Sequence, residues 1–373
     1  MTPPRPRARD LGLPFPGRPG PLNAITDVAG VRVGLRTLTD PARAMRTGVT
    51  AIVPRDDRDV PRPVLAGQFT LNGNGEMTGT HWIHDAGQFI GPVCITNTHA
   101  VGMVHHAATR WMIDRYGTFF ATEHAWAMPV VAETYDGVLN DINALHVTEG
   151  DARAALDGAT GGPVAEGSTG GGNGMICYGF KGGTGTASRR VATAGGDWTV
   201  GALVQANHGL RPWLNILGVP VGRLMPEGAP EEWRAEREQG SIIVVLATDA
   251  PLSPLSLRHL ARRAALGIGR HGTPGGNDSG DIFLAFSTAD AGPVAPHAPA
   301  LVARTEINPE HVTALYLGAV EAVEEAVVNA LVAGEDAPTV KPAGQLCRAL
   351  DTARLARLFA AQTRPEPPPS AEG

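Results

Sequence analysis

The sequence predicts a compact globular chain that combines helices with strands, and three observations support this fold class. Of its 373 residues, 43% are hydrophobic and only 18% are charged, which supplies a substantial core. Glycine is frequent, with 47 residues, whereas aromatic residues make up 5%, a composition typical of many tight turns and close backbone approaches. Short apolar runs typical of buried strands alternate with segments whose apolar residues recur at helical spacing.

The elements of the N-terminal half can be predicted in order. The first 20 residues contain six prolines, so they are expected to follow the surface without forming a helix or a central strand. The segments expected next are two strands around a glycine turn at 25–34, a strand at 49–54, a glycine-rich loop at 67–79 that lines a site, a helix at 101–116 and a strand at 127–133.

The C-terminal half continues this alternation. Residues 166–190 form a glycine-rich stretch that lacks both GxxxxGK[ST] and GxGxxG spacing, so we expect a packed hairpin and no phosphate-bearing cofactor. The further predicted elements are strands at 175–180, 200–205, 241–247, 282–288 and 301–307, and helices at 255–266, 309–332 and 347–361, with a disordered tail from 363 to 373. Residues 21–362 are thus expected to form one domain.

Charge and cysteine content exclude several kinds of partner. The formal net charge is −6 and basic residues gather only in short pairs such as Arg262-Arg263, so we expect no nucleic-acid partner. No apolar run reaches membrane-spanning length and no signal-peptide core is present, so we expect a cytoplasmic protein without membrane contact. The three widely spaced cysteines are expected to be buried thiols.

The histidines do not form a recognisable metal motif. His81 and His84 could share one helical face, and His99, His105 and His106 follow, but no HExxH or comparable ligand set accompanies them. We therefore expect no metal site.

The chain is organised around residues 275–281, which read GGNDSGD and run directly into the apolar strand at 282–288. Ser279 consequently lies where a buried strand begins, although an ordinary turn would have the same composition. Asn207 also falls at a strand end, where its amide could stabilise an oxyanion or simply form a turn. Glu133 and Tyr135 end another strand, as a substrate rim or as a charged turn.

Glu324 is an acid on the apolar stripe of the predicted helix at 309–332. At 100° per residue it falls among Val320, Val323, Val327 and Leu331. It must either meet a buried donor or orient a nucleophile.

Ordered motifs run through nearly the whole chain. They are residues 11–20, NAITDV at 23–28, LNGNGEMTG at 71–79, TNTHAVG at 96–102, ETYDG at 133–137, GFKGGTGTASR at 179–189, VQAN at 204–207 and NDSGDI at 277–282. Together they resemble the serine peptidase family that includes L-aminopeptidase/D-esterase and the β-peptidyl aminopeptidases. The resemblance implies a four-layer αββα sandwich like that of N-terminal-nucleophile hydrolases.

The resemblance also implies a self-processing enzyme without a cofactor. Its chain would be cut between Asp278 and Ser279, and the processed heterodimers would form a homo-oligomer. Ser279 would then be the nucleophile towards a small peptide, amide or ester, Asn207 and Tyr135 would face the tetrahedral intermediate, and Glu133 would hold the substrate ammonium. The family pattern includes a supporting serine and glutamate, for which Glu306 and Glu324 both stay candidates.

Two other functions compete with this interpretation. One is an acyltransferase of the ornithine acetyltransferase type, which is also self-processing but uses threonine, so Ser279 argues against it. The other is an uncleaved, non-catalytic binding protein of the same fold. An intact bond between Asp278 and Ser279 would favour it.

Overall fold

The computed structural model describes residues 6–228, 238, 240–289 and 299–362. Its strands are β1 (Arg32–Asp40), β2 (Met45–Val53), β3 (Pro63–Gly73), β4 (Gln88–Ile90), β5 (Val93–Asn97), β6 (Val130–Thr134), β7 (Ile176–Cys177), β8 (Phe180–Lys181), β9 (Gly183–Thr193), β10 (Gly196–Asn207), β11 (Ser241–Thr248), β12 (Gly280–Ser287), β13 (Ala337–Val340) and β14 (Ala343–Cys347). Its α-helices are α1 (Thr80–Ala86), α2 (Val101–Thr122), α3 (Glu149–Asp157), α4 (Val221–Leu224), α5 (Pro254–Gly269), α6 (Thr313–Val332) and α7 (Thr352–Gln362).

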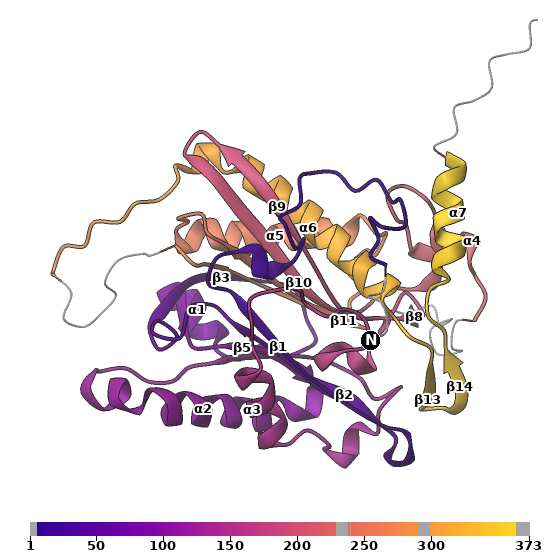
Figure 1. The fold of residues 1–373 in the computed structure, drawn as a ribbon, viewed down its shortest axis with the longest axis horizontal. Coiled ribbons are helices and arrows are strands. Elements are labelled where there is room, and N and C mark those ends of the chain that lie inside the picture. The colour runs from indigo at the N-terminus through magenta and orange to yellow at the C-terminus, as the bar shows by residue number, and fades with distance from the viewer. Residues whose placement is uncertain (1–5, 229–237, 239, 290–298, 363–373) are drawn as a thin grey trace, which may run out of the picture.

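Two large sheets are stacked between two layers of helices (Figure 1). One sheet has four strands in the order β1-β2-β5-β6, and the other has six in the order β4-β3-β12-β11-β10-β9. Helices α5 and α6 cover the outer face of the six-stranded sheet, and α2 and α3 cover the other sheet (Figure 1). The αββα sandwich implied by the resemblance is confirmed.

Three apolar cores hold these layers together. The core between the sheets contains Ile95, Leu203 and Ile243, whereas Phe283 belongs to the core beneath α5 and α6. A third core, which includes Trp111, lies between α2, α3 and the four-stranded sheet. Because burial of apolar surface is the main driving force of folding, these cores account for the stacking.

Strand β12 lies inside the six-stranded sheet, parallel to β11 and antiparallel to β3. All eight of its residues are buried. Its side chains alternate, so Ile282 and Leu284 enter the core between the sheets while Phe283 and Ala285 enter the core beneath the helices. Burial on both faces explains why the sequence shows a continuous apolar run rather than an alternating one.

Most predicted elements are confirmed, but the structure corrects five. The single strand predicted at 175–180 is a hairpin, in which β7 and β8 pair antiparallel around a turn at Tyr178 and Gly179. Residues 25–27 form a 3-10 turn rather than a strand, because the Asp27 carboxylate accepts hydrogen bonds from the N–H groups of Leu22 and Ala24. The first part of the predicted loop, 67–73, belongs to β3. The stretch at 301–307 forms no strand, and the last helix starts at Thr352 because 343–347 is β14.

A glycine explains the correction in β3. A β-carbon on Gly67 would lie 2.1 Å from the backbone nitrogen of Arg258, so only glycine lets α5 pack this closely on the strand. The glycine that suggested a loop therefore marks a contact between a strand and a helix.

The N-terminal segment contributes to the core as well as following the surface. Within 6–20 there is no helix or sheet strand, as predicted, but Ala8, Leu13 and Phe15 are buried. Its Arg9 pairs with Glu325 of α6 at 2.9 Å, and Glu325 also pairs with the buried Arg189 of β9 at 2.8 Å. This network ties the segment to the helical layer.

The predicted tail at 363–373 and most of the connector at 289–299 lie outside the described residues. In the part of the chain that the structure describes, no helix is long and apolar enough to cross a membrane.

Candidate active site

Ser279 lies directly before β12 and its side chain is fully buried. Its hydroxyl donates a hydrogen bond to Oδ1 of Asp281 at 2.7 Å. Burial raises the pKa of Asp281 to about 6, against the lowering effect of the Ser279 hydroxyl. The serine at the head of the strand thus already has an acceptor for its proton.

Sequence analysis did not identify Asp281 as a site residue. Side chains two residues apart in extended backbone point to the same face, so the spacing Ser-x-Asp at the start of a strand was a usable signal. The same rule assigns the Asp281 carboxylate to the face of β12 that carries Phe283 and Ala285.

Asn207 ends β10 at the same edge of the sheet. It lies opposite Ser241, which in turn lies opposite Gly280, so the ends of three adjacent strands meet here. Its Nδ2 donates to the carbonyl oxygen of Tyr135 at 3.0 Å, and its Oδ1 accepts from the N–H of Ile176 at 2.8 Å. These two bonds fix the orientation of the amide towards the gap between the sheets.

Glu133 of β6 approaches the same edge from the four-stranded sheet. A β-carbon on Gly75 would lie 3.0 Å from Oε1 of Glu133 and 3.6 Å from Cα of Gly280, so Gly75 lies between the carboxylate and the start of β12 with little room to spare. The structure therefore brings Glu133, Asn207 and the residue after Ser279 to one place.

The Glu133 carboxylate is 4% exposed and both of its oxygens are engaged. Oε1 accepts from the N–H of Glu76 at 3.0 Å, and Oε2 accepts from the Thr98 hydroxyl. Burial raises the pKa of Glu133, and the hydrogen bond from Thr98 opposes this effect. A buried carboxylate with few donors is suited to receive a cationic group.

The backbone and the side chain of Tyr135 have different neighbours. Its carbonyl oxygen meets Asn207, whereas its phenol lies over Gly137, where a β-carbon would be 2.2 Å from the hydroxyl oxygen. The side chain is 36% exposed. The phenol is thus at the surface of this region and free to meet a ligand from outside.

The bond between Asp278 and Ser279 lies against the loop that follows β3. The carbonyl oxygen of Asp278 accepts from Nδ2 of Asn74 at 2.6 Å, while the Asp278 carboxylate accepts from Nδ2 of the exposed Asn277. Residues 74–76 of the predicted glycine-rich loop thus lie beside this bond and beside Glu133. The Asp278 carboxylate is directed to Asn277 and not to the Ser279 hydroxyl.

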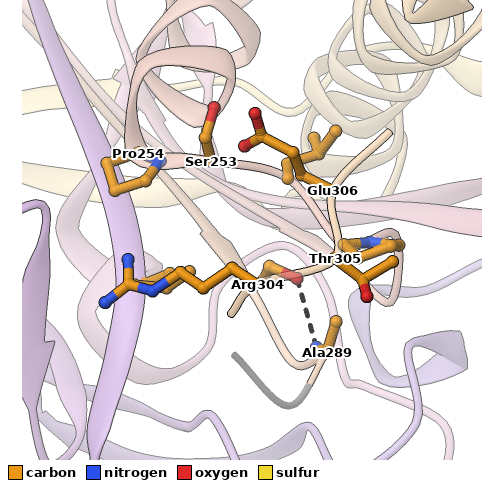
Figure 2. Close-up of a pocket in the computed structure, with 10 residues that line it drawn as sticks. Ser253, Pro254, Ala289, Arg304, Thr305 and Glu306 are labelled. Atoms are coloured by element: carbon orange, nitrogen blue, oxygen red, sulfur yellow. Dashed lines mark hydrogen bonds between the residues drawn. The ribbon is translucent and has the colours of Figure 1, made fainter. Parts of the chain in front are cut away.

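The structure does not bring Glu306 to Ser279. Figure 2 shows Glu306 with Arg304 and Thr305 around a pocket that Ser253 and Ala289 also line. This pocket borders Ser287, at the opposite end of β12, and a strand of eight residues spans roughly 25 Å. Residues 301–306 are exposed.

Glu324 is likewise engaged elsewhere. Its Oε2 pairs with Nη1 of Arg270 at 2.6 Å, just beyond the end of α5. The acid on the apolar face of α6 is thus paired, but its partner Arg270 is partly exposed and is not the buried donor that one of the two interpretations required. The acceptor of the Ser279 hydroxyl is Asp281.

We expect Glu324→Gln to leave self-cleavage at Ser279 unchanged and to lower the free energy of unfolding by about 1 kcal/mol or less, because Arg270 is partly exposed to water. Chemical denaturation and intact mass measure the two effects. A folded variant that failed to cleave would restore Glu324 as the acid that supports the nucleophile.

Among the residues that the structure describes, no three His, Cys, Asp or Glu side chains are grouped so that they could hold a metal ion.

Comparison with known proteins agrees with this geometry. The model of peptidase family S58 matches residues 23–343. β-Peptidyl aminopeptidase BapA of Sphingosinicella microcystinivorans is 49% identical over 348 residues, which cover 88% of this chain and 86% of that protein. The homologous enzyme of Sphingosinicella xenopeptidilytica is 47% identical over 351 residues, with 88% and 85% covered.

Solved structures show the same similarity. The L-aminopeptidase D-Ala-esterase/amidase from Ochrobactrum anthropi, described as a variant of the Ntn hydrolase fold, superposes with a TM-score of 0.90 at 56% identity, covering 96% of this chain and 99% of that one. A β-aminopeptidase from a Burkholderia species gives a TM-score of 0.88 at 46% identity, with 96% and 100% covered.

The stacked sheets and the similarity to these enzymes thus define a hydrolase of the aminopeptidase class with an Ntn-type fold. The chain belongs to peptidase family S58.

Proposed function

We propose that this aminopeptidase cuts its own backbone between Asp278 and Ser279 and then uses Ser279 as its nucleophile. The cut would leave chains of 278 and 373 − 278 = 95 residues. The observation that carries the proposal is the position of Ser279, which is buried at the start of β12, at the sheet edge where Asn207 and Glu133 also lie.

Cleavage supplies the general base for turnover. Once Ser279 begins a chain, its α-amine has a pKa near ~8 and lies beside its own hydroxyl. The hydroxyl attacks the carbonyl carbon that follows the substrate's N-terminal residue, and the proton passes to the amine and then to the leaving group. Water afterwards hydrolyses the ester on Ser279. No histidine is required in this scheme.

Cleavage also opens the site. In the intact chain the Ser279 hydroxyl is bonded to Asp281 on the helical side of β12, whereas Asn207 and Glu133 lie towards the space between the sheets. In the intact chain the Ser279 nitrogen is an amide that is bonded to Asp278 and donates to the Gly276 carbonyl, so it cannot act as a base; the cut removes this link. We infer that the uncut chain is an inactive precursor.

Two groups give the site its substrate class. The Glu133 carboxylate binds the ammonium of an unblocked N-terminus, and Asn207 stabilises the tetrahedral oxyanion, with the Tyr135 phenol at the outer side. We propose short peptides, amides or esters with a free amine as substrates, including β-amino and D-amino derivatives, since relatives are named for such activities. We further propose cytoplasmic homo-oligomers of the processed heterodimer.

The intact mass of the purified protein under denaturing conditions tests the proposal without a chosen substrate. Two species that correspond to 278 and 95 residues support it, and a single mass for all 373 residues contradicts it. The second result would favour an uncleaved binding protein of the same fold.

We expect Glu133→Gln to reduce kcat/KM for substrates with a free amine by roughly 10- to 100-fold, mainly through KM. A charge-assisted hydrogen bond is worth about 1.5–3 kcal/mol, and 1.4 kcal/mol corresponds to a factor of ten. Steady-state kinetics with an aminoacyl anilide measures the effect.

Glu76→Gln is the matched control for this variant. Glu76 is exposed and reaches Glu133 through its backbone N–H, which the substitution keeps. If both variants retained the wild-type KM, the ammonium would have to bind elsewhere.

A further inference from the structure

The turn before Ser279 is held in place by side chains from two other segments. The Gly276 carbonyl accepts from the Ser279 N–H at 2.9 Å and from Nδ2 of Asn72 at 3.0 Å. The Gly276 N–H donates to Oε2 of the buried Glu238 at 3.0 Å. These bonds fix the backbone on the N-terminal side of the bond that is to be cut.

Self-cleavage cannot use the base that serves turnover. Before the cut the nitrogen of Ser279 is an amide and carries no basic lone pair, so another group must take the hydroxyl proton. The structure offers Asp281, whose Oδ1 accepts from the Ser279 hydroxyl at 2.7 Å. Asp281 is 1% exposed, so water competes little for this proton.

Self-cleavage also needs a donor for the oxygen of the scissile carbonyl, where negative charge develops. That oxygen belongs to Asp278 and accepts from Nδ2 of Asn74 at 2.6 Å. Asn207, the donor proposed for turnover, is instead bonded to the Tyr135 carbonyl in the intact chain. The precursor and the mature enzyme thus present different amides to their respective oxyanions.

Resting on the proposed function, we propose that Asn74 and Asp281 catalyse the self-cleavage step, as oxyanion donor and general base, and that turnover by the same Ser279 uses a different donor and a different base. The Oγ atom of Ser279 bonds to the carbonyl carbon of Asp278 while the hydroxyl proton passes to Asp281. Asn74 stabilises the oxyanion that results. The C–N bond then breaks and the proton returns to the departing nitrogen, which becomes the α-amine. Water then hydrolyses the ester and releases the main-chain α-carboxylate of Asp278, which becomes the C-terminus of the first chain.

The surroundings of Asp281 give this step a pH dependence. Burial raises the pKa of Asp281 to about 6, and the charge of Glu238 acts in the same direction. Hydrogen bonds from the Ser279 hydroxyl, from Asn72 on β3 and from the backbone of Ile242 on β11 oppose them. Because a general base must be ionised, the cleavage rate is expected to rise as the pH passes through about 6 and to level off above it.

The test follows the full chain during cell-free synthesis, with intact mass recorded over time. Asn74→Ala and Asn74→Asp both remove the N–H donor, and each is expected to slow cleavage roughly 100-fold, the typical effect of one oxyanion donor. Asn74 is exposed, so these changes are expected to have little effect on the stability of the fold. Asn277→Ala is the matched control, because Asn277 is also an exposed amide of this turn but contacts the Asp278 side chain.

Asp281→Asn is expected to slow cleavage roughly 100-fold or more and to abolish the rise near pH 6. Thermal melting checks that each variant is folded. If the wild-type chain itself stays uncut, the proposed function fails. If the wild-type chain is cut and the Asn74 or Asp281 variants are cut at the same rate, the assignment of these residues is overturned. It is also overturned if Asn277→Ala is cut as slowly as Asn74→Ala.

Discussion

Replacing Ser279 with alanine is expected to yield one uncut chain of 373 residues that hydrolyses no aminoacyl anilide. The change removes the only atom that, in the proposed scheme, attacks both the scissile peptide bond and the substrate. It also leaves the Asp281 carboxylate without its hydroxyl partner. Intact mass measures the first effect and a substrate assay the second.

Two control variants separate this loss from misfolding. Ser287→Ala changes another buried serine of the same strand, whose hydroxyl donates to the Ala250 carbonyl at 2.7 Å, so it should be cut normally. Ser279→Cys keeps a nucleophile and should be cut, although at a different rate. A Ser279→Ala chain that still separated into two species would end the case for this nucleophile.

The sequence supported the prediction of elements better than that of their contacts. The strand at 282–288 and the helices at 101–116 and 255–266 were predictable because apolar spacing follows directly from how each element is buried. Residues 67–73 were not, because Gly67 serves the packing of α5 on β3, and sequence alone does not show which distant segment approaches a glycine.

The site was predictable to a similar extent. Ser279, Asn207 and Glu133 each end or begin a strand, and strand ends that share an edge lie together. Helix periodicity drew attention to Glu324 and did not predict the acceptor of the Ser279 hydroxyl. An apolar stripe does not show whether a basic residue such as Arg270 meets the acid on it. Asp281 lay closer in sequence than either candidate considered.

Replacing Asn207 is expected to reduce kcat by roughly 100- to 1,000-fold, or about 3 kcal/mol of transition-state stabilisation. Alanine would also leave the buried N–H of Ile176 without its acceptor, which costs stability and confuses the result. Asn207→Asp keeps an oxygen for Ile176 and removes the Nδ2 donor, so it is the sharper variant. An effect on kcat with little change in KM indicates an interaction made mainly in the transition state.

Gln205→Ala is a suitable control, since Gln205 is a buried amide on the same strand that donates to the Thr96 carbonyl and the Thr134 hydroxyl. It should lower the melting temperature while the turnover of each processed enzyme stays near the wild-type value. Asn207→Asp should still cut itself, because Asn74 and not Asn207 donates to the Asp278 carbonyl. An Asn207→Asp chain that is processed normally but turns over slowly would show that self-cleavage and turnover use different oxyanion donors. A normal kcat in Asn207→Asp would show that Asn207 has no role in the mechanism.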